Sequence, residues 1–434
     1  MNDHRAALKK NLFDLPTGWS WHWLTDVISI QGGTQPPANT FSSVPLPGYV
    51  RLVQIRDFET DAHVTFIPDS KKWRKCGEED ILIARYGAAL GRICKGLSGA
   101  YNVALAKVVP SNSVDSGFIY QLLRSSFFQD PVLAMGGRSA QAGFNKDGLS
   151  VIPVPIPPLP EQRAIAATLG ALDDKIELNR KMNATLEAMA RALFRDWFVD
   201  FGPTRAKMEG GKSYLSPELW SLFPDRLDSD GKPEGWETGT LGDLATLNPE
   251  SWSAKRAPAG VRYVDLANTK WGTIDKIEEY DWADAPSRAR RILRPGDTIV
   301  GTVRPGNGSF AHIGEDGLTG STGFAVLRPN DPRDRGFVWC AATSPENIDR
   351  LAHLADGGAY PAVRPDAVAG TEIVIPDAPI LAAFDEIGRA HLDMMEANKR
   401  ESRTLARTRD LLLPRLMSGE LRVAEAETLA SEVA

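Results

Sequence analysis

Two stretches of the chain repeat apolar residues every seven positions, which is the spacing of a helix that pairs with another helix. The first runs from Glu161 to about Phe198 without a proline, and its seam consists of Ile165, Leu172, Asn179, Leu186 and Leu193. The second follows residue 379, and its equivalent seam consists of Phe384, His391, Asn398, Leu405 and Leu412. The pattern predicts two long helices, over 159–201 and 380–422, that pack antiparallel as a coiled coil.

The rest of the chain has a different pattern, in which short β-branched and aromatic runs alternate with Gly, Pro and Asn turns. Residues 80–84, 102–109 and 297–303 are typical of strands, whereas residues 117–124 favour a helix. A proline-rich run at 152–158 then interrupts any regular element. We therefore expect two globular domains of mixed α/β structure, over 1–158 and 233–379. A linker over 202–232 and a tail over 423–434 complete the predicted organisation.

The two halves repeat each other. Leu15-Pro16-Thr17-Gly18-Trp19 returns as Lys232-Pro233-Glu234-Gly235-Trp236, and four further runs return in the same order, at offsets between 211 and 219 residues. One such match has little weight, but five in order indicate an internal duplication. Each half then consists of one α/β domain followed by one long helix.

Asn179 and Asn398 interrupt the apolar seams at equivalent positions near the midpoints of the two predicted helices. Each asparagine is either an ordinary exposed residue or a buried polar partner. In an antiparallel pair the midpoints coincide, which favours the second interpretation. A buried polar pair would fix the register of the helices at some cost in stability.

Composition limits the class of protein. The 434 residues carry 50 Lys and Arg against 56 Asp and Glu, a formal net charge of −6, with 42% hydrophobic residues. These values are typical of a globular protein of two or three domains. Three widely spaced cysteines offer neither a disulfide framework nor a zinc ribbon. Neither a signal peptide nor a membrane-spanning run is recognisable, so a cytoplasmic protein is expected.

Several motifs resemble one family. The run from Pro155 to Ala166, with its core Pro-Leu-Pro-Glu-Gln, resembles the domain-to-helix junction of the DNA-specificity (S) subunit of type I restriction–modification systems. The runs 193–201 and 412–421 resemble the ends of that family's two conserved helices, and the two Gly-Trp openings resemble the starts of its target-recognition domains. The second junction departs from the pattern, because Ala378-Pro379-Ile380-Leu381 lacks the Glu-Gln pair.

The resemblance implies a function. Each target-recognition domain would read one half of a bipartite site in double-stranded DNA, and the two helices would set the spacing. Two modification (methyltransferase) subunits would dock on the helices, carry S-adenosylmethionine and methylate adenine at N6. Motor-nuclease restriction subunits would complete the assembly. This chain itself would hold no cofactor or metal and would catalyse nothing.

The residues agree with a non-catalytic chain. The sequence lacks a Gly-x-x-x-x-Gly-Lys-Ser/Thr loop, a His-Glu-x-x-His motif and an Asn/Asp-Pro-Pro-Tyr/Phe motif. Residues 302–311 fit Gly-x-Gly-x-x-Ala nominally, but no helix follows them to receive a phosphate. A protein-binding adaptor without DNA contacts remains the alternative, and its support is the acidic second domain.

Charge divides unevenly between the domains. Residues 1–158 hold 16 basic and 13 acidic residues, whereas residues 233–379 hold 15 and 21. Neither domain is the strongly basic module expected of an independent DNA binder. We therefore expect local DNA contacts, with the modification subunits supplying much of the attraction to phosphates.

Base reading requires Arg, Lys, Asn and Gln side chains on loops, because these pair with the edges of guanine and adenine. For most single candidates, an ordinary solvated loop side chain is the better explanation. Arg138 with Gln141, and Tyr360 with Arg364, stand out because each pair follows a Gly-Gly at equivalent repeat positions. The full set of candidates is Gln35, Lys71, Lys72, Arg74, Arg85, Tyr86, Arg138, Gln141, Asn145, Lys146, Asn268, Lys270, Arg304, Asn307, Tyr360 and Arg364.

Overall fold

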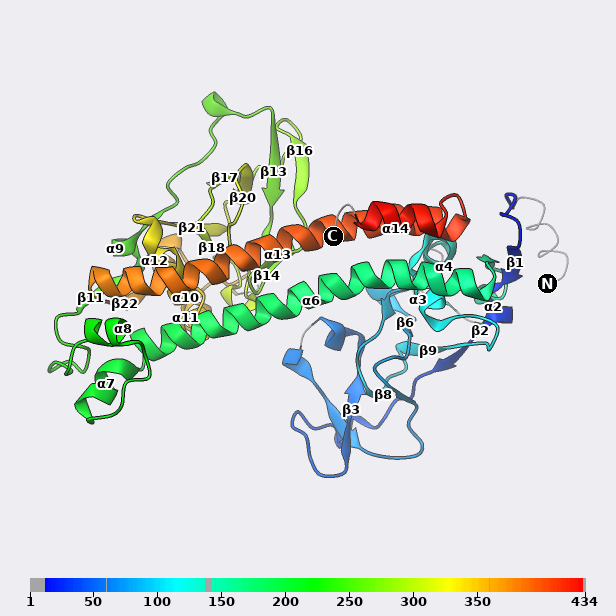
Figure 1. The fold of residues 1–434 in the computed structure, drawn as a ribbon, viewed down its shortest axis with the longest axis horizontal. Coiled ribbons are helices and arrows are strands. Elements are labelled where there is room, and N and C mark those ends of the chain that lie inside the picture. Colours follow the sequence, from blue (N-terminus) through cyan, green and yellow to red (C-terminus); the bar gives the residue numbers. More distant parts are fainter. Residues whose placement is uncertain (1–11, 60, 137–142, 145, 359, 432–434) are drawn as a thin grey trace. The chain divides into compact units, whose positions relative to one another are not determined.

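The computed structural model describes residues 12–431 apart from residues 60, 137–142, 145 and 359. The chain divides into two compact units, one of residues 1–178 with 401–434 and the other of residues 179–400. Each unit holds one α/β domain and one half of each of two long helices, α6 (Leu159–Phe198) and α13 (Ala378–Ser418), which are labelled in Figure 1.

The first unit contains two four-stranded sheets, with strand orders β2-β9-β6-β7 and β4-β3-β8-β5, and a separate pair of β1 with β10. Strands β3 and β8 are parallel, whereas the other pairings are antiparallel. The strands are β1 (Ser20–Trp23), β2 (Ile28–Gly32), β3 (Tyr49–Val53), β4 (Phe66–Pro68), β5 (Lys75–Cys76), β6 (Leu82–Ala84), β7 (Ile93–Cys94), β8 (Gly99–Tyr101), β9 (Leu105–Pro110) and β10 (Pro153–Ile156). The helices besides α6 and α13 are α2 (Leu24–Val27), α3 (Ser116–Arg124), α4 (Ser126–Gly136), α5 (Lys146–Leu149) and α14 (Val423–Ser431).

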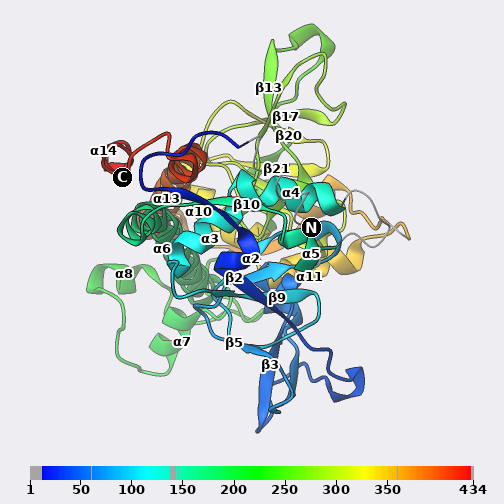
Figure 2. The same cartoon turned by 90° about the vertical axis from the view of Figure 1, so that its right-hand side faces the viewer.

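The second unit repeats this topology. Its sheets have the orders β12-β21-β18-β19 and β16-β13-β20-β17, β13 and β20 are parallel, and β11 pairs with β22. Figure 2 shows β13, β17 and β20 side by side. The strands are β11 (Glu237–Thr240), β12 (Ala245–Leu247), β13 (Gly260–Val264), β14 (Thr269–Lys270), β15 (Thr273–Ile274), β16 (Glu278–Asp281), β17 (Ala289–Leu293), β18 (Thr298–Gly301), β19 (Phe310–His312), β20 (Leu318–Ser321), β21 (Phe324–Pro329) and β22 (Glu372–Ile375). The helices are α7 (Gly202–Met208), α8 (Pro217–Leu222), α9 (Leu241–Leu244), α10 (Arg335–Ala342), α11 (Pro345–Leu354) and α12 (Pro365–Ala369).

The shared strand orders confirm the predicted mixed α/β class and the internal duplication. The hairpin β14–β15 is an addition in the second unit, since the described part of the first unit has no equivalent two-stranded pair.

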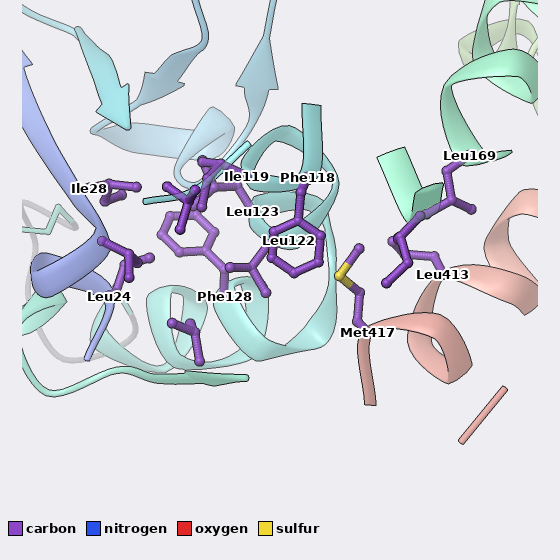
Figure 3. Packing of buried hydrophobic residues seen from close by; sticks show 14 of the residues in the cluster. Leu24, Ile28, Phe118, Ile119, Leu122, Leu123, Phe128, Leu169, Leu413 and Met417 are labelled. Atoms are coloured by element: carbon purple, nitrogen blue, oxygen red, sulfur yellow. The ribbon is translucent and has the colours of Figure 1, made fainter. Parts of the chain in front are cut away.

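Both cores bind the domain to the long helices. In the first unit, Phe118 and Leu122 of α3 lie in one buried cluster with Leu169 of α6 and with Leu413 and Met417 of α13 (Figure 3). In the second unit, Phe194 of α6 packs edge-on against Phe337 of α10, at a ring-centroid distance of 5.2 Å, and against Phe384 of α13, at 6.2 Å. The start of α6 therefore packs with the end of α13, and the end of α6 with the start of α13, which is the predicted antiparallel pairing.

The helix ends differ slightly from the expected ones. Helix α6 ends at Phe198, three residues before the predicted end, and Phe201 then has a left-handed backbone (φ 56°) as the N-cap of α7. Helix α13 begins two residues earlier than expected and ends at Ser418, where Gly419 has φ 75°. A left-handed glycine at this position is a common helix stop. The predicted linker contains α7 and α8, and the predicted tail contains the whole of α14.

Among the residues that the structure describes, no helix combines the length and the apolarity needed to cross a lipid bilayer.

Candidate nucleic-acid interface and helix-pairing seam

Three asparagines meet where α6 and α13 pack in the second unit. The Asn398 side-chain amide donates to Oδ1 of Asn183 at 2.8 Å, and the Asn183 amide donates to the Met395 carbonyl at 3.1 Å. The Asn179 amide lies 3.5 Å from the Asn398 carbonyl oxygen, a long hydrogen bond, and its side chain is buried. The predicted contact between Asn179 and Asn398 is confirmed, and Asn183, one helical turn further along α6, is the partner that the side chain of Asn398 binds.

Most of the predicted seam is buried. Ile165, Leu172, Asn179, Phe384, Asn398, Leu405 and Leu412 are each less than 9% exposed. Leu186, Leu193 and His391 are only partly buried, and the most buried residues near them are Ala190, Phe194, Trp197 and Leu392. A straight α-helix drifts by about 20° per heptad relative to a strict seven-residue repeat, so the buried stripe moves off the predicted positions.

Asp173 of α6 ties three elements of the first unit together. Its carboxylate accepts hydrogen bonds from Gln121 and Arg124 of α3, and from Arg409 of α13 at 2.8 Å. Burial alone would raise the pKa of Asp173, but these hydrogen bonds and the charge of the Arg124 guanidinium hold the pKa below its ordinary value. The domain and both helices of this unit therefore share one charged centre.

The junction motif has a structural reason in the first repeat. Gln162 is buried, accepts from the Asp115 backbone N–H at 2.8 Å and donates to the Pro157 carbonyl at 2.9 Å. Glu161 accepts a hydrogen bond from the Trp19 indole N–H at 2.9 Å. This bond joins the Gly-Trp opening of the first domain to the Pro-Leu-Pro-Glu-Gln junction.

The second junction lacks this acceptor. The position that corresponds to Glu161 is Ile380, and the buried indole N–H of Trp236 has no hydrogen-bond partner among the described residues. The missing Glu-Gln pair thus leaves one buried indole N–H of the second repeat without an acceptor among the described residues.

Three candidate loops of the first domain come together. Gln35 is exposed and follows Gly33, where a Cβ would lie 2.0 Å from the Asn102 carbonyl oxygen. The Arg74 backbone N–H donates to Oγ1 of Thr34 at 3.4 Å, and Arg85 lies beside Gly32. A glycine at 33 is therefore required for the close approach that brings these loops together.

Arg85 and Tyr86 form a second feature of that surface. The Arg85 guanidinium stacks over the exposed Tyr86 ring, 5.0 Å from its centroid, and Tyr86 pairs with Gly143 as an isolated bridge. The other candidates of this domain do not join a common surface in the described residues. Lys71 and Lys72 lie exposed between β4 and β5, Lys146 is exposed at the start of α5, and Arg138, Gln141 and Asn145 lie outside the described residues.

The second domain brings Arg304, Asn307 and Tyr360 to one place. Arg304 and Asn307 are exposed on the loop after β18, and the Arg304 guanidinium stacks over the Tyr360 ring at 4.7 Å. The Arg304 backbone N–H also donates to the Pro361 carbonyl at 2.7 Å, which joins the two segments directly. Lys270 is exposed at the end of β14, Asn268 is half-buried before it, and Arg364 is the exposed N-cap residue of α12.

The sequence analysis missed two contributors. Trp271 is 57% exposed at the turn of the β14–β15 hairpin, and its indole packs on Gly308 of the Arg304 loop. Asp173 was also absent from the candidates. It directly follows the seam residue Leu172, and this position beside the seam places its carboxylate near the partner helix. For Trp271 the usable signal is the following Gly272, a residue typical of hairpin turns.

Two further features of the described residues concern metal ions and cavities. Among these residues no group of three His, Cys, Asp or Glu is arranged to hold a metal ion. A cavity of about 660 Å³ lies beside the end of α6, lined by Phe194, Phe198, Phe337 and residues of β22. It is predominantly apolar, and its charged lining residues are Glu346, Arg350 and Glu372.

Comparison with known proteins gives these features a context. Residues 16–188 match the family model of the type I restriction modification DNA specificity domain. The chain is 24% identical over 338 residues to the type I restriction enzyme MjaIX specificity subunit of Methanocaldococcus jannaschii, covering 75% of this chain and 73% of that protein. It is 26% identical over 365 residues to the HindI specificity subunit of Haemophilus influenzae, covering 72% and 78%. The crystal structure of an S subunit from M. genitalium shares the fold, with a TM-score of 0.54 at 13% identity over 93% of this chain and 98% of that one.

Proposed function

Because residues 16–188 belong to the type I restriction–modification DNA specificity domain family, we propose that this chain is the DNA-recognition subunit of such a system. Each α/β domain would read one half of a bipartite site in double-stranded DNA. The adaptor alternative is disfavoured, because it explains neither the arginine–tyrosine stack in each domain nor the specificity subunits among the relatives.

The observation that carries the proposal is the repeated loop after the third strand of each domain's first sheet. In the first domain this loop presents Arg85 stacked on the neighbouring Tyr86. In the second domain it presents Arg304, two positions further along the loop, and this arginine stacks on Tyr360 of the segment between α11 and α12. A guanidinium held against an aromatic ring is oriented to donate in a plane, which suits the edge of a guanine in the major groove. One such stack in each domain, at positions that differ between the repeats, suits a site with two separate halves of different sequence.

The helices would serve as a spacer and as a docking site. At about 1.5 Å per residue, the 40 residues of α6 extend over about 60 Å, longer than one turn of B-DNA. We propose that α6 and α13 fix the gap between the half-sites and bind two modification subunits. Those subunits would carry S-adenosylmethionine and methylate adenine, and restriction subunits would add cleavage. Since DNA is the proposed ligand, the cytoplasm is the proposed place of action.

The test is to express the full chain with its modification subunits in cells that lack other adenine methylation, and to sequence the modified bases. We expect a two-part adenine motif with a fixed gap that depends on this chain. An undivided motif, or the same methylation without the chain, would overturn the proposal. Cells with the chain alone should show no methylation, which tests the assignment of catalysis to the partners.

A further inference from the structure

Two residues of the second domain adopt a backbone conformation that their side chains disfavour. In the described part of the chain, the residues other than glycine with positive φ are Phe201, Asn248, Trp271 and Arg304. Asn248 is well explained, because asparagine tolerates this region and exchanges hydrogen bonds with the backbone of Val326. Phe201 marks the break between α6 and α7. Trp271 and Arg304 belong to neither class. Arg304 begins the loop 304–308, and the Trp271 ring packs on Gly308 of that loop.

The repeat shows that Arg304 is not required by the backbone. The strand registers of β6–β9 and β18–β21 place Gly87 of the first domain at the position of Arg304, and Gly91 at that of Gly308. The φ values agree, at 72° for Gly87 against 47° for Arg304, and 82° for Gly91 against 68° for Gly308. The same loop is therefore built with glycine in one domain and with a strained arginine in the other. A glycine at 304 would relieve the strain.

Trp271 also has a strained backbone conformation. It is the first of the two residues that connect β14 to β15, where φ is 46° for Trp271 and 83° for Gly272. Two-residue hairpin turns with positive φ at both positions favour asparagine, aspartate or glycine at the first. The tryptophan nevertheless presents an indole that is 57% exposed, seated on Gly308, where a Cβ would lie 2.6 Å from the ring.

The third member of this surface is Tyr360, which is 71% exposed although it is a large aromatic residue. Its ring supports the Arg304 guanidinium at 4.7 Å. Strain at two exposed residues of one loop cluster persists where the side chains have a use that outweighs it.

We propose that Arg304, supported by Tyr360, and Trp271 form the specificity-determining contact of the second domain with its half-site. The Arg304 guanidinium donates to a guanine edge in the major groove, and the Trp271 indole packs against the adjacent nucleotide. Because Gly308 has no side chain, the indole of the β14–β15 turn lies directly against the Arg304 loop, and both side chains can reach the DNA together. This inference rests on the proposed function, because it names residues that read the DNA.

The test uses substitutions that relieve strain, Arg304→Gly and Trp271→Asn, in the full chain expressed with its modification subunits. Lys276→Ala is the matched control, since it removes an exposed cation of the same domain whose partner is Glu278. The readouts are the melting temperature of the purified complex and the sequence of methylated sites in cells. Substitution of a structural residue lowers the melting temperature and keeps the methylated motif, whereas substitution of a base-reading residue keeps the melting temperature and changes the motif.

We expect both variants to melt no more than about 2 °C below the wild type, because the new residues suit the backbone. Discrimination at one base pair of one half-site should fall about ten- to a hundredfold for Arg304→Gly, while the other half-site keeps its motif. The control should keep the whole motif.

Unchanged motif and occupancy in both variants would overturn the inference and leave the proposed function intact. A lowered melting temperature with uniformly weaker methylation would show a structural role and also overturn it. If the wild-type chain gives no split motif, the proposed function itself fails, so the two failures are distinguishable.

Discussion

The asparagine cluster of the helix pair allows the cost in stability of substituting its members to be predicted. Asn398 is buried and Asn183 is half-buried, and their side chains share a hydrogen bond of 2.8 Å. Substituting Asn183→Ala leaves the buried Asn398 amide without its acceptor, which costs about 2 kcal/mol within the usual range of about 1–3 kcal/mol. Substituting Asn398→Ala leaves an oxygen that water can reach, so about 1 kcal/mol is expected. The double variant loses the shared bond only once, which predicts a coupling energy of about 1 kcal/mol.

Labelling of a buried cysteine thiol in urea measures this coupling energy in the second unit alone. Cys340 is buried in the same hydrophobic core as the end of α6 and the start of α13 in the second unit, and burial raises the pKa of its thiol to about 12. The thiol is therefore protected until the unit opens, and 1 kcal/mol corresponds to about a fivefold change in its opening equilibrium. Cys76 and Cys94, buried in the first unit, are internal references.

The double-mutant cycle separates the interaction from the loss of side-chain volume. We expect Asn183→Ala to increase Cys340 labelling more than Asn398→Ala does, and the two effects to be less than additive. Additive effects, with a coupling energy below about 0.3 kcal/mol, would refute the claim that the two amides hold each other inside the helix pair.

Two further predictions concern the first unit. Glu161→Ala removes the acceptor of the Trp19 indole and should raise Cys94 labelling by an amount that corresponds to about 1–2 kcal/mol, a result that equal labelling of variant and wild type would contradict. Asp173→Asn should destabilise the unit near neutral pH, because the folded-state pKa of Asp173 lies below its ordinary value of about 3.9. The stabilisation is present above the unfolded pKa and is lost as pH falls through the folded pKa, so wild type and variant should converge in urea titrations on acidification towards pH 3; a constant difference would show that the charge of Asp173 is unimportant.

The long helices were predictable because one physical signal dominates them. Apolar residues at a seven-residue spacing, without proline through most of the helix length, admit few structures other than paired helices. Asn179 and Asn398 stand out because they are polar residues at equivalent positions of the two seams. The identity of Asn183 as the binding partner was not predictable, because it depends on a stagger of one helical turn between α6 and α13. Helix ends were less predictable too, since α6 stops where the Phe201 backbone turns left-handed.

The loop surfaces were predictable only by residue type. Arg304 and Tyr360 were candidates because arginine and tyrosine suit DNA, but their stacking joins segments 56 positions apart in the sequence. Trp271 was overlooked because strands of two residues leave almost no periodic signal. The repeat supplied what periodicity could not, since only the comparison of Gly87 with Arg304 reveals that the arginine is optional for the fold.

The charge of the second domain shows why net charge misjudges a reading surface. Its acidic residues outnumber its basic ones, yet several are consumed internally: Asp297 and Glu250 bind Arg328, and Glu250 and Asp316 bind Arg294. These carboxylates neutralise arginines of the sheets at short range, where they add little to the field at a distant loop.

Lys270 and Arg364, by contrast, have no ion pair among the described residues and lie exposed in the segments that flank the Arg304 loop. Their charge remains available to phosphates. An acidic domain can therefore present a cationic surface to DNA, and substitution of either residue by alanine should weaken DNA binding evenly across sequences and reduce its salt dependence by about one counterion. A loss that depends on the base sequence would instead make Lys270 or Arg364 a reader, and would shift the proposed contact away from Arg304 and Trp271.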